Sequence, residues 1–227
     1  MIRQGRRFFS TLFIILMSMN SLSNAEKISP GCADDLDQTA LKTVREAMPD
    51  YWVREKARDA ARRIEQALAL EPRLHFGYDI LKIYYCFHQK KCDQAVILLK
   101  KAIQHCPDYY GHHYGLAEVY VKMGKHAEAL ASYKNALDKG EQETAYFYFK
   151  VAESHVALKQ RDEAISNLRK SLELDERYFI ARRNLIGLLY LSQNKQEALS
   201  EARILISLKP DAKMMQWAKT VIRKMSQ

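Results

Sequence analysis

The four cysteines carry the most specific side-chain chemistry of this 227-residue chain. Cys86 and Cys92 are six positions apart. Cys106 follows 14 positions after Cys92, and Cys32 lies far upstream. Four cysteines allow three complete disulfide pairings, and thiolates are also preferred ligands of zinc. Their positions therefore raise two chemical alternatives, a disulfide framework and a metal site.

Histidines accompany the cysteines in two separate groups that contain zinc-ligand residue types. These groups are Cys86, His88 and Cys92 and, further along the chain, His105, Cys106, His112 and His113. Neither group has the spacing of a recognised zinc motif, and the chain has no paired Cys-x-x-Cys. We therefore expect no metal ion and no cofactor, which leaves disulfide bonds and buried thiols as the alternatives.

The motifs that mark enzyme active sites are absent from the sequence. It has no glycine-rich phosphate loop, no Gly-x-Ser-x-Gly nucleophile elbow and no His-Glu-x-x-His zinc motif. His155 falls on the inward side of an expected helix, where a core or groove histidine is the ordinary interpretation. The sequence thus predicts no catalytic residue and a protein that is not an enzyme.

A repeated pattern of small and apolar residues indicates which elements position these side chains. Alanines recur at intervals of 35, 34, 35 and 34 residues, at Ala60, Ala95, Ala129, Ala164 and Ala198. In each copy an apolar residue follows four positions later, and a small or apolar residue follows seven positions later. Offsets of 0, 4 and 7 form one stripe along an α-helix. We therefore predict five similar helices, each buried along this stripe.

Prolines stand in register twelve residues after three of these alanines, at Pro72, Pro107 and Pro210. A proline there ends one helix before the next begins. Upstream of each alanine, another expected helix carries apolar positions such as Leu116 and Ala117. This layout resembles the tetratricopeptide repeat, a helix-turn-helix unit with a period of about 34 residues.

The resemblance covers roughly residues 36 to 212 and implies an all-α fold, a right-handed superhelix of antiparallel helix pairs. Two departures from the family pattern stand out. Pro49 interrupts the expected first helix of the leading copy, and Ile83 and Cys86 replace the family's small residue and tyrosine in the next copy. The expected organisation is a degenerate leading repeat at 36–75, four repeats at 76–109, 110–144, 145–178 and 179–212, and a capping helix at 213–227.

The first 25 residues have the layout of a secretory signal peptide. Three arginines precede an apolar run from Phe8 to Met19, and small residues follow up to Ala25. That run of about 12 residues is shorter than the roughly 20 that a membrane-spanning helix needs. We therefore predict cleavage near Ala25, a flexible lead-in at 26–35, no stable membrane span after cleavage, and a periplasmic or secreted location. A retained anchor and a mitochondrial transit peptide are the alternatives.

The net charge gives little support for a nucleic-acid partner. The chain carries 36 Lys and Arg against 27 Asp and Glu, and its net charge of +9 falls to +6 without the three arginines of the leader. The remaining basic residues are spread over the expected helix faces, whereas nucleic-acid binding needs a concentrated basic patch. We therefore expect no nucleic-acid partner.

Antiparallel helix pairs restrict the disulfide pairings. Cys92 and Cys106 lie near opposite ends of one expected helix, on the order of 20 Å apart at about 1.5 Å per residue. A disulfide needs Cα atoms within about 7 Å, so this pair is excluded, as is Cys86 with Cys106. The complete pairing that remains joins Cys86 with Cys92 and Cys32 with Cys106. A reduced and buried Cys86 is the alternative.

The resemblance also implies where a ligand binds. In the family, the first helix of each pair lines the concave side of the superhelix and carries the ligand-contacting positions. Several of these positions hold aromatic residues here, which bind well because they bury area at a small entropic cost. Some of the rings are expected to pack between helices instead, Phe149 first among them. The residues expected to form a partner-binding groove are Tyr84, Phe87, His88, Tyr114, Glu118, Tyr146, Phe149, Lys150, Glu153, Arg183, Asn184 and Tyr190.

These inferences lead to two functional classes. The first is a non-catalytic protein-protein interaction adaptor of the bacterial envelope, which binds a partner peptide or helix in its concave groove and assists assembly of a pilus, a secretion apparatus or an outer-membrane complex. The second is an accessory or regulatory subunit of an envelope enzyme system, such as cell-wall or cytochrome maturation. Both classes require a protein partner, and neither requires chemistry by the chain itself.

Overall fold

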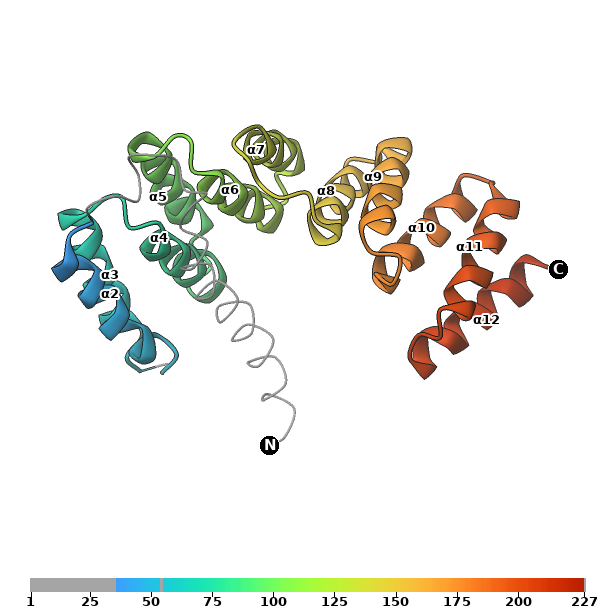
Figure 1. Ribbon diagram of the computed structural model, residues 1–227, viewed down its shortest axis with the longest axis horizontal. Helices are drawn as coiled ribbons and strands as arrows, with labels where there is room; N and C mark the ends of the chain where they lie inside the picture. The colour runs from blue at the N-terminus through green and yellow to red at the C-terminus, as the bar shows by residue number, and fades with distance from the viewer. Residues whose placement is uncertain (1–35, 54, 227) are drawn as a thin grey trace.

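The computed structural model describes residues 36–53 and 55–226, which fold into helices joined by short turns (Figure 1). The expected signal peptide 1–25 and lead-in 26–35 lie outside these described residues. This part of the chain contains no β-strand. Its helical elements are α2 (Gln38–Tyr51), α3 (Ala57–Leu70), α4 (His75–Lys82), the π-helical η2 (Ile83–His88), α5 (Cys92–His105), α6 (Tyr110–Lys122), α7 (His126–Asp138), α8 (Ala145–Ala157), α9 (Arg161–Leu174), α10 (Phe179–Leu191), α11 (Lys195–Ser207) and α12 (Ala212–Met225).

The helices follow one another as antiparallel pairs and form an arch (Figure 1). The pair α2 and α3 lies at one end of the arch, and α11 and α12 lie at the other. The first helices of the central pairs, α4, α6, α8 and α10, lie on the inner side of the arch, which we call the concave face. Their partners α5, α7, α9 and α11 lie farther out. The predicted all-α solenoid of helix pairs is thus confirmed.

The five alanines of the repeat are buried within the helix pairs. Ala60, Ala95, Ala129, Ala164 and Ala198 are at most 1% exposed. The residues four and seven positions after each alanine are also at most 1% exposed. A small side chain at the first position lets the neighbouring helix approach closely, and the buried stripe holds the two helices together. One sequence pattern therefore explains the same packing in all five pairs.

Left-handed residues end the first helices of the four central pairs. Lys90, Gly124, Lys159 and Gln193 have φ angles of 58°, 74°, 61° and 61°. A residue in this conformation lets the chain leave one helix and turn into the next. Gly124 is the one glycine among these four residues, so it adopts the left-handed conformation without the steric strain that a Cβ causes. The four residues are 34, 35 and 34 positions apart, so the turns repeat with the period of the alanines.

The first helix of the second pair contains one extra residue. It begins at His75, and its left-handed Lys90 follows 15 positions later, whereas the corresponding distance is 14 in the next three pairs. The π-helical segment η2 absorbs the extra residue, because a π turn holds one residue more than an α turn. The backbone hydrogen bond at the end of the first helix also shows the extra residue. It spans six residues in this pair, from the N–H of Lys91 to the carbonyl of Tyr85, and five residues in the other three pairs.

This insertion corrects the expected register of the second pair. With His75 as the first residue of α4, Lys82 stands at the small position that Ala117 and Ala152 occupy in the next two pairs. The repeat pattern of the sequence predicted Ile83 at this position. The difference arises because the π turn lies between this position and Ala95 and adds one residue, and no residue of the repeat pattern indicates a π turn.

A repeated hydrogen bond supports the corrected register. Tyr78, the fourth residue of α4, donates its hydroxyl to the carbonyl of Pro72 at 3.0 Å. His113, the fourth residue of α6, places Nε2 3.0 Å from the carbonyl of Pro107. In both pairs a side chain therefore binds the carbonyl six positions earlier, at the proline that precedes the helix.

The two end helices depart from the repeat in different ways. α2 continues through Pro49 to Tyr51, so the proline does not interrupt this helix as the sequence analysis expected. Pro49 removes one i→i−4 hydrogen bond from the helix, but it lies in the last turn, and only two helical residues follow it before α2 ends at Tyr51. α12 begins after the N-cap Asp211, packs on α11 and buries Ala218 and Met225.

Candidate functional site: the concave face

Most of the residues predicted to bind a partner are at least partly exposed on the first helices. Phe87, Tyr146 and Tyr190 present large rings to solvent, with exposed fractions of 44%, 49% and 52%. His88 and Arg183 are exposed as well. The half-buried members of the predicted set are Tyr114, Glu118, Lys150, Glu153 and Asn184.

Tyr84 and Phe149 are the members of the predicted set that the structure buries, each at 7% exposure. Tyr84 lies in η2, and its ring centroid is 6.4 Å from that of Tyr51. The ring of Phe149 packs edge-on against Tyr178 at 5.3 Å. Neither ring is placed to contact a partner, which corrects the groove assignment of both. For Phe149 the burial agrees with the expectation that this ring packs between helices. For Tyr84 the physical reason is the π turn, which changes the direction of side chains in this segment.

Lys82 joins α4 to α6 through an ion pair in the helix interface. Its Nζ lies 2.8 Å from Glu118 and 3.6 Å from Asp79, and its side chain is only 10% exposed. Burial alone would lower the pKa of Lys82, but the two carboxylates raise it above its ordinary value, so the ammonium stays charged. Gly115 leaves room for this side chain, because a Cβ there would lie 3.3 Å from Lys82 Cδ.

An aromatic cluster supports the concave face between α6 and α8. The ring of Tyr114 lies 5.6 Å from that of Tyr133 and 6.2 Å from that of Phe147. Burial raises the pKa of Tyr114 and of Tyr133, and the carboxylate of Glu118 raises both further. The Tyr133 hydroxyl is buried and has no hydrogen-bond partner within the described part of the chain. The cluster therefore contains a polar atom that no described residue satisfies.

Further carboxylates lie near these rings. Glu153 forms a salt bridge with Lys150, three residues earlier on α8. Glu141, in the turn before α8, is half-buried, and burial raises its pKa to about 7. A hydrogen bond from the N–H of Gln142 opposes that shift, and the nearby Glu118 adds to it. Glu141 forms no salt bridge with a described lysine, arginine or histidine.

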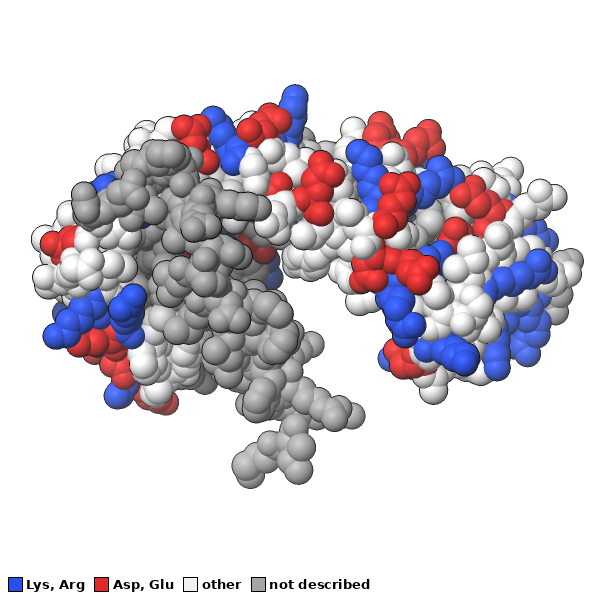
Figure 2. Space-filling view, viewed as in Figure 1, with Lys and Arg blue, Asp and Glu red and all other residues white. Residues whose placement is uncertain are grey.

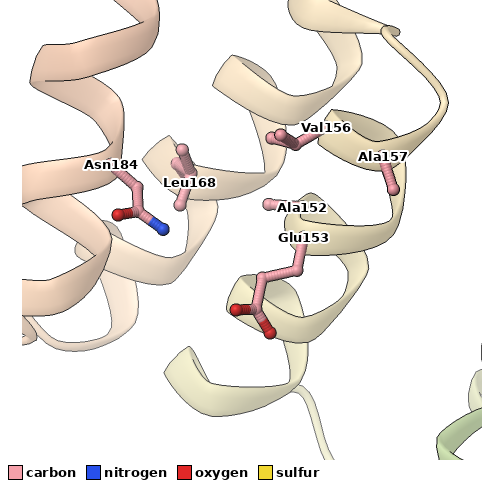
Figure 3. Close-up of a pocket in the computed structure, with 6 residues that line it drawn as sticks. All are labelled: Ala152, Glu153, Val156, Ala157, Leu168 and Asn184. Carbon is pink, nitrogen blue, oxygen red and sulfur yellow. The ribbon is translucent and has the colours of Figure 1, made fainter. Parts of the chain in front are cut away.

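A pocket of about 240 Å³ opens between α8, α9 and α10 (Figure 3). Glu153 of α8 and Asn184 of α10 supply its polar groups, and both belong to the predicted set. The rest of the lining is apolar, from Ala152, Val156, Ala157 and Leu168. Such a pocket suits a small apolar side chain flanked by a hydrogen-bonding group.

Charge is distributed unevenly along the surface of the arch. In Figure 2, lysine and arginine side chains gather over the end formed by α11 and α12, whereas both signs are mixed over the middle. Within the described residues, no helix combines the length and the apolar character that crossing a membrane requires.

Two buried histidines meet at the interface between α4 and α6. His75 Nδ1 lies 3.0 Å from His112 Nε2, and the ring of Tyr109 stacks on that of His75 at 3.8 Å. Burial lowers the pKa of His112 to about 3, with a smaller contribution from His75, so the His112 imidazole is neutral. No three His, Cys, Asp or Glu side chains in the described ranges are grouped so that they could hold a metal ion.

Cys86 and Cys92 form a disulfide across the turn between η2 and α5, with Cα atoms 4.0 Å apart. Neither thiol is therefore available as a metal ligand, and Cys86 is not a reduced, buried cysteine. Cys106 is also disulfide-bonded. Cys32, which the sequence analysis pairs with Cys106, lies outside the described residues.

Several residues of the concave face do not follow from the sequence pattern. Asp79, Lys82, Tyr133 and Glu141 were not in the predicted set, yet they surround Tyr114 and Glu118. No sequence signal identified Lys82, because the spacing of 15 positions from His75 to Lys90 depends on a helix start and a φ angle that only the structure gives. No sequence signal identified Tyr133, because its position four residues after a repeat alanine is a core position in every copy.

Comparisons with known proteins agree with this architecture. Three tetratricopeptide repeat family models match the chain, over residues 46–110, 87–150 and 145–178. The sequence matches no curated protein.

Solved structures with low sequence identity share the fold. YrrB, described as a TPR protein with an unusual peptide-binding site, is 21% identical, with 73% of this chain and 85% of that chain covered and a TM-score of 0.59. A MamA fragment from Desulfovibrio magneticus is 16% identical, with coverage of 77% and 97% and a TM-score of 0.65. A tetratricopeptide repeat protein from Parabacteroides merdae is 19% identical, with coverage of 84% and 74% and a TM-score of 0.65. These likenesses concern the fold alone.

The stacked helix pairs and their concave face define an α-solenoid of the kind that contacts other proteins. The chain belongs to the tetratricopeptide repeat family.

Proposed function

We propose that the protein is a non-catalytic adaptor whose concave face binds a peptide or helix of a partner protein. The exposed rings on the first helices carry this proposal, with Tyr146 and Tyr190 at 49% and 52% exposure. Rigid aromatic rings beside charged and amide groups are typical of the residues that dominate binding energy at protein interfaces. The pocket beside Glu153 and Asn184 adds a place for one apolar side chain of the partner.

A structural likeness supports the choice of ligand class. YrrB, which shares the fold at 21% identity, is described as having a peptide-binding site. A solenoid presents a long, continuous surface, which suits an extended or helical segment better than a compact small molecule.

The bacterial envelope is the proposed location, on the strength of the signal-peptide layout of residues 1–25. There the protein assists assembly of a multiprotein complex, namely a pilus, a secretion apparatus or an outer-membrane complex. Mass spectrometry of the protein from an envelope fraction tests the location, because cleavage near Ala25 predicts a mature chain that begins at Glu26. An uncleaved chain in the cytosol would contradict it.

The proposed binding mode is tested by affinity capture from envelope extracts. The variant Tyr146→Ala with Tyr190→Ala removes two exposed concave rings and should capture much less partner than the unaltered protein. The matched control is Ile97→Ala with Leu174→Ala, which removes exposed apolar side chains from the second helices α5 and α9, at 69% and 51% exposure. The control should capture as much partner as the unaltered protein.

Two results would contradict partner binding at the concave face. One is equal capture by the concave variant and the unaltered protein, and the other is an equal loss in the control variant. Circular dichroism should show the same helix content in all variants, because the replaced side chains are exposed and alanine is a strong helix former. Captures at low and raised salt show how much of the binding is electrostatic.

The alternative is that the partner is an enzyme of cell-wall or cytochrome maturation, which the protein docks as an accessory or regulatory subunit. The absence of enzyme motifs from the sequence favours both roles equally. Identification of the captured partner separates them, since an enzyme on the concave face supports the accessory role and a structural component supports the adaptor role.

A further inference from the structure

The two end helices of the arch have the same length, 14 residues each, but different charge. α2 carries two basic and two acidic side chains, Lys42, Arg45, Glu46 and Asp50. α12 carries no acidic side chain and four basic ones, Lys213, Lys219, Arg223 and Lys224. The helix that ends a solenoid needs a polar outer side for solubility, and α2 meets that need with mixed charge. The end of a solenoid therefore does not require the single sign of charge that α12 has.

The four basic residues of α12 lie on one side of the helix. With 3.6 residues per turn, their positions fall within an arc of about 140° around the helix axis. All four side chains are exposed. They extend over 11 positions, which is on the order of 16 Å along the helix. We call Lys213, Lys219, Arg223 and Lys224 the basic face of α12.

The opposite side of α12 is packed against the protein. Ala218 and Met225 are buried, and Met214, Val221 and Ile222 pack against the same core cluster. This side contacts α11, so the basic face is directed away from the solenoid. Within the described residues no helix follows α12, and the basic face is open to solvent.

The basic face forms no salt bridge with a described Asp or Glu. The two carboxylates of α11 pair with other helices, Glu197 with Arg169 of α9 and Glu201 with Arg182 of α10. Residues 195–225 contain seven basic and three acidic side chains. Figure 2 shows basic side chains gathered over this end of the arch. The positive charge of α12 is therefore available to an external anion.

The residue types favour a diffuse anionic surface over one specific acidic group. Three of the four basic residues are lysines, whose ammonium groups act as point charges, whereas arginine makes the paired hydrogen bonds that fix a single carboxylate or phosphate. No residue of α12 lines the pocket beside Glu153 and Asn184. The basic face thus offers cations along an exposed helix side, and a membrane with anionic headgroups presents many phosphates in a plane.

We propose that the basic face of α12 docks the protein on a membrane surface that contains anionic phospholipids. The cationic groups lie among the headgroup phosphates, and α12 stays packed on α11 instead of inserting into the hydrocarbon. Each basic side chain near such a surface raises the affinity roughly fivefold. The inference goes beyond the proposed function, because it assigns a second surface, outside the concave face, to another ligand.

Co-sedimentation with vesicles tests the proposal, with the protein purified from an envelope fraction. One set of vesicles contains phosphatidylcholine alone, and the other contains about one third phosphatidylglycerol, an anionic lipid. We expect at least about tenfold tighter binding to the anionic vesicles, and raised salt should remove most of the difference. An apolar contact of the chain with lipid would be the same for both sets, so it does not affect the comparison. Equal binding to both sets would overturn the proposal.

Matched variants locate the lipid contact. Lys213→Gln with Lys219→Gln and Arg223→Gln removes three charges from the basic face and should weaken binding to the anionic vesicles at least about tenfold.

The control removes the same charge from exposed positions on α5 and α7, by Lys100→Gln with Lys101→Gln and Lys134→Gln. Its affinity should change less than about twofold, because screening limits the effect of distant charges. An equal loss in the control would show attraction by net charge alone and would overturn the proposal. All six side chains are exposed and glutamine is a good helix former, so circular dichroism should show the same helix content in both variants.

The two tryptophans of the chain report the orientation on the membrane without a change of charge. Trp52 follows α2 and Trp217 belongs to α12, at opposite ends of the arch (Figure 1). Trp217 is half-buried and stands four positions after Lys213, at the border of the basic face. Energy transfer to dansyl-labelled headgroups should be stronger from Trp217, in a Trp52→Phe variant, than from Trp52, in a Trp217→Phe variant. Equal transfer, or stronger transfer from Trp52, would overturn docking through α12.

Competition with soluble polyanions separates lipid from other acidic ligands. Polyglutamate represents an acidic protein segment, and duplex DNA represents a nucleic acid. Each should release the protein from the anionic vesicles only when its charge concentration exceeds that of the accessible phosphatidylglycerol. Release at a lower concentration would identify an acidic polymer as the ligand and overturn the assignment to lipid.

The lipid surface and the proposed function can fail separately. If the anionic vesicles do not bind, but partner capture still depends on Tyr146 and Tyr190, the lipid surface is wrong and the adaptor function stands. If vesicle binding depends on the basic face, but capture is independent of these two rings, the concave binding site is wrong and the lipid surface stands.

Discussion

Lys82 and Glu118 form a salt bridge between the first helices of two adjacent pairs, with 2.8 Å between Nζ and Oε2. In the next two pairs, Ala117 and Ala152 occupy the position of Lys82 and are at most 1% exposed. The interface between α4 and α6 therefore contains an ion pair where its neighbours have apolar packing. This difference has consequences for stability that can be measured.

A double-mutant cycle tests the coupling of Lys82 to Glu118. Lys82→Met leaves two carboxylates without a cation in a largely buried interface, and we expect a loss of about 2 to 3 kcal/mol in the free energy of unfolding. With Glu118→Gln also present, much of that loss should be recovered, because one of the unpaired charges is gone. Urea unfolding measures both values. Simple additivity of the two single substitutions would contradict the coupling.

Gly115 and Gly187 give a matched test of the space that Lys82 needs. Gly187→Ala in α10 meets nothing within 4 Å, so it should stabilise the protein by about 0.8 to 1 kcal/mol through helix propensity. Gly115→Ala places a Cβ 3.3 Å from Lys82 Cδ and should gain much less or be destabilising. In a Lys82→Ala background the two substitutions should have similar effects. Equal effects in the unaltered background would show that Lys82 does not occupy the space over Gly115.

The disulfide between Cys86 and Cys92 should stabilise the turn that follows the π-helical segment. It closes a loop of six positions, and loop-closure entropy predicts a loss of about 2 kcal/mol on replacing both cysteines by alanine. The chemical denaturation midpoints of the variant and of the unaltered protein, both under oxidising conditions, measure this loss. An unchanged midpoint would mean that the disulfide adds nothing to the stability of the pair.

Much of the architecture follows from the sequence, because one small residue per copy fixes a whole helix pair. The alanine at each repeat position requires a close helix contact, so Ala60 and its four equivalents located the second helices correctly. The first helix of the second pair was misplaced by one residue, because a π turn changes the count of residues without changing the composition. The expectation for Pro49 was wrong for a different reason: the proline removes one backbone hydrogen bond, but it stands only two residues before the end of α2, so there is little helix after it to disrupt.

The candidate site was only partly accessible to sequence reasoning. The positions of Tyr146 and Tyr190 follow from the repeat, and both are exposed. Tyr84 was assigned to the groove because the repeat frame contained no π turn, and it is buried. The proximity of Glu141 to Glu118 depends on how two neighbouring repeats stack, which a pattern within one repeat does not specify.

Protonation of His112 should weaken the fold in acid. Its pKa is lowered to about 3 in the folded protein, whereas an unfolded histidine titrates near the model value of 6.5. The unfolded state therefore binds more protons between these values, and the free energy of unfolding should fall as the pH falls through this window, by up to about 1.4 kcal/mol per pH unit. Stability measured from pH 7 to pH 5 should decrease more steeply for the unaltered protein than for His112→Gln.

Titration of Glu141 changes the stability of the protein with pH in the opposite direction, so its contribution must be separated from that of His112. Its pKa is raised from 4.5 to about 7, so the folded state binds more protons in that range and gains stability as the pH falls. The comparison with His112→Gln cancels this contribution, since Glu141 is present in both proteins. Identical pH profiles for the two proteins would contradict a buried, neutral His112.

Site-specific photocrosslinking tests most directly whether the concave face holds the partner. A benzophenone amino acid at position 146 places the probe on the concave side of α8, and one at position 97 places it on exposed α5, whose residue Ile97 is 69% exposed. Irradiation of cells should give a covalent adduct with the partner from position 146 and none from position 97. An adduct from position 97 alone, or equal adducts from both positions, would contradict a binding surface on the inner side of the arch.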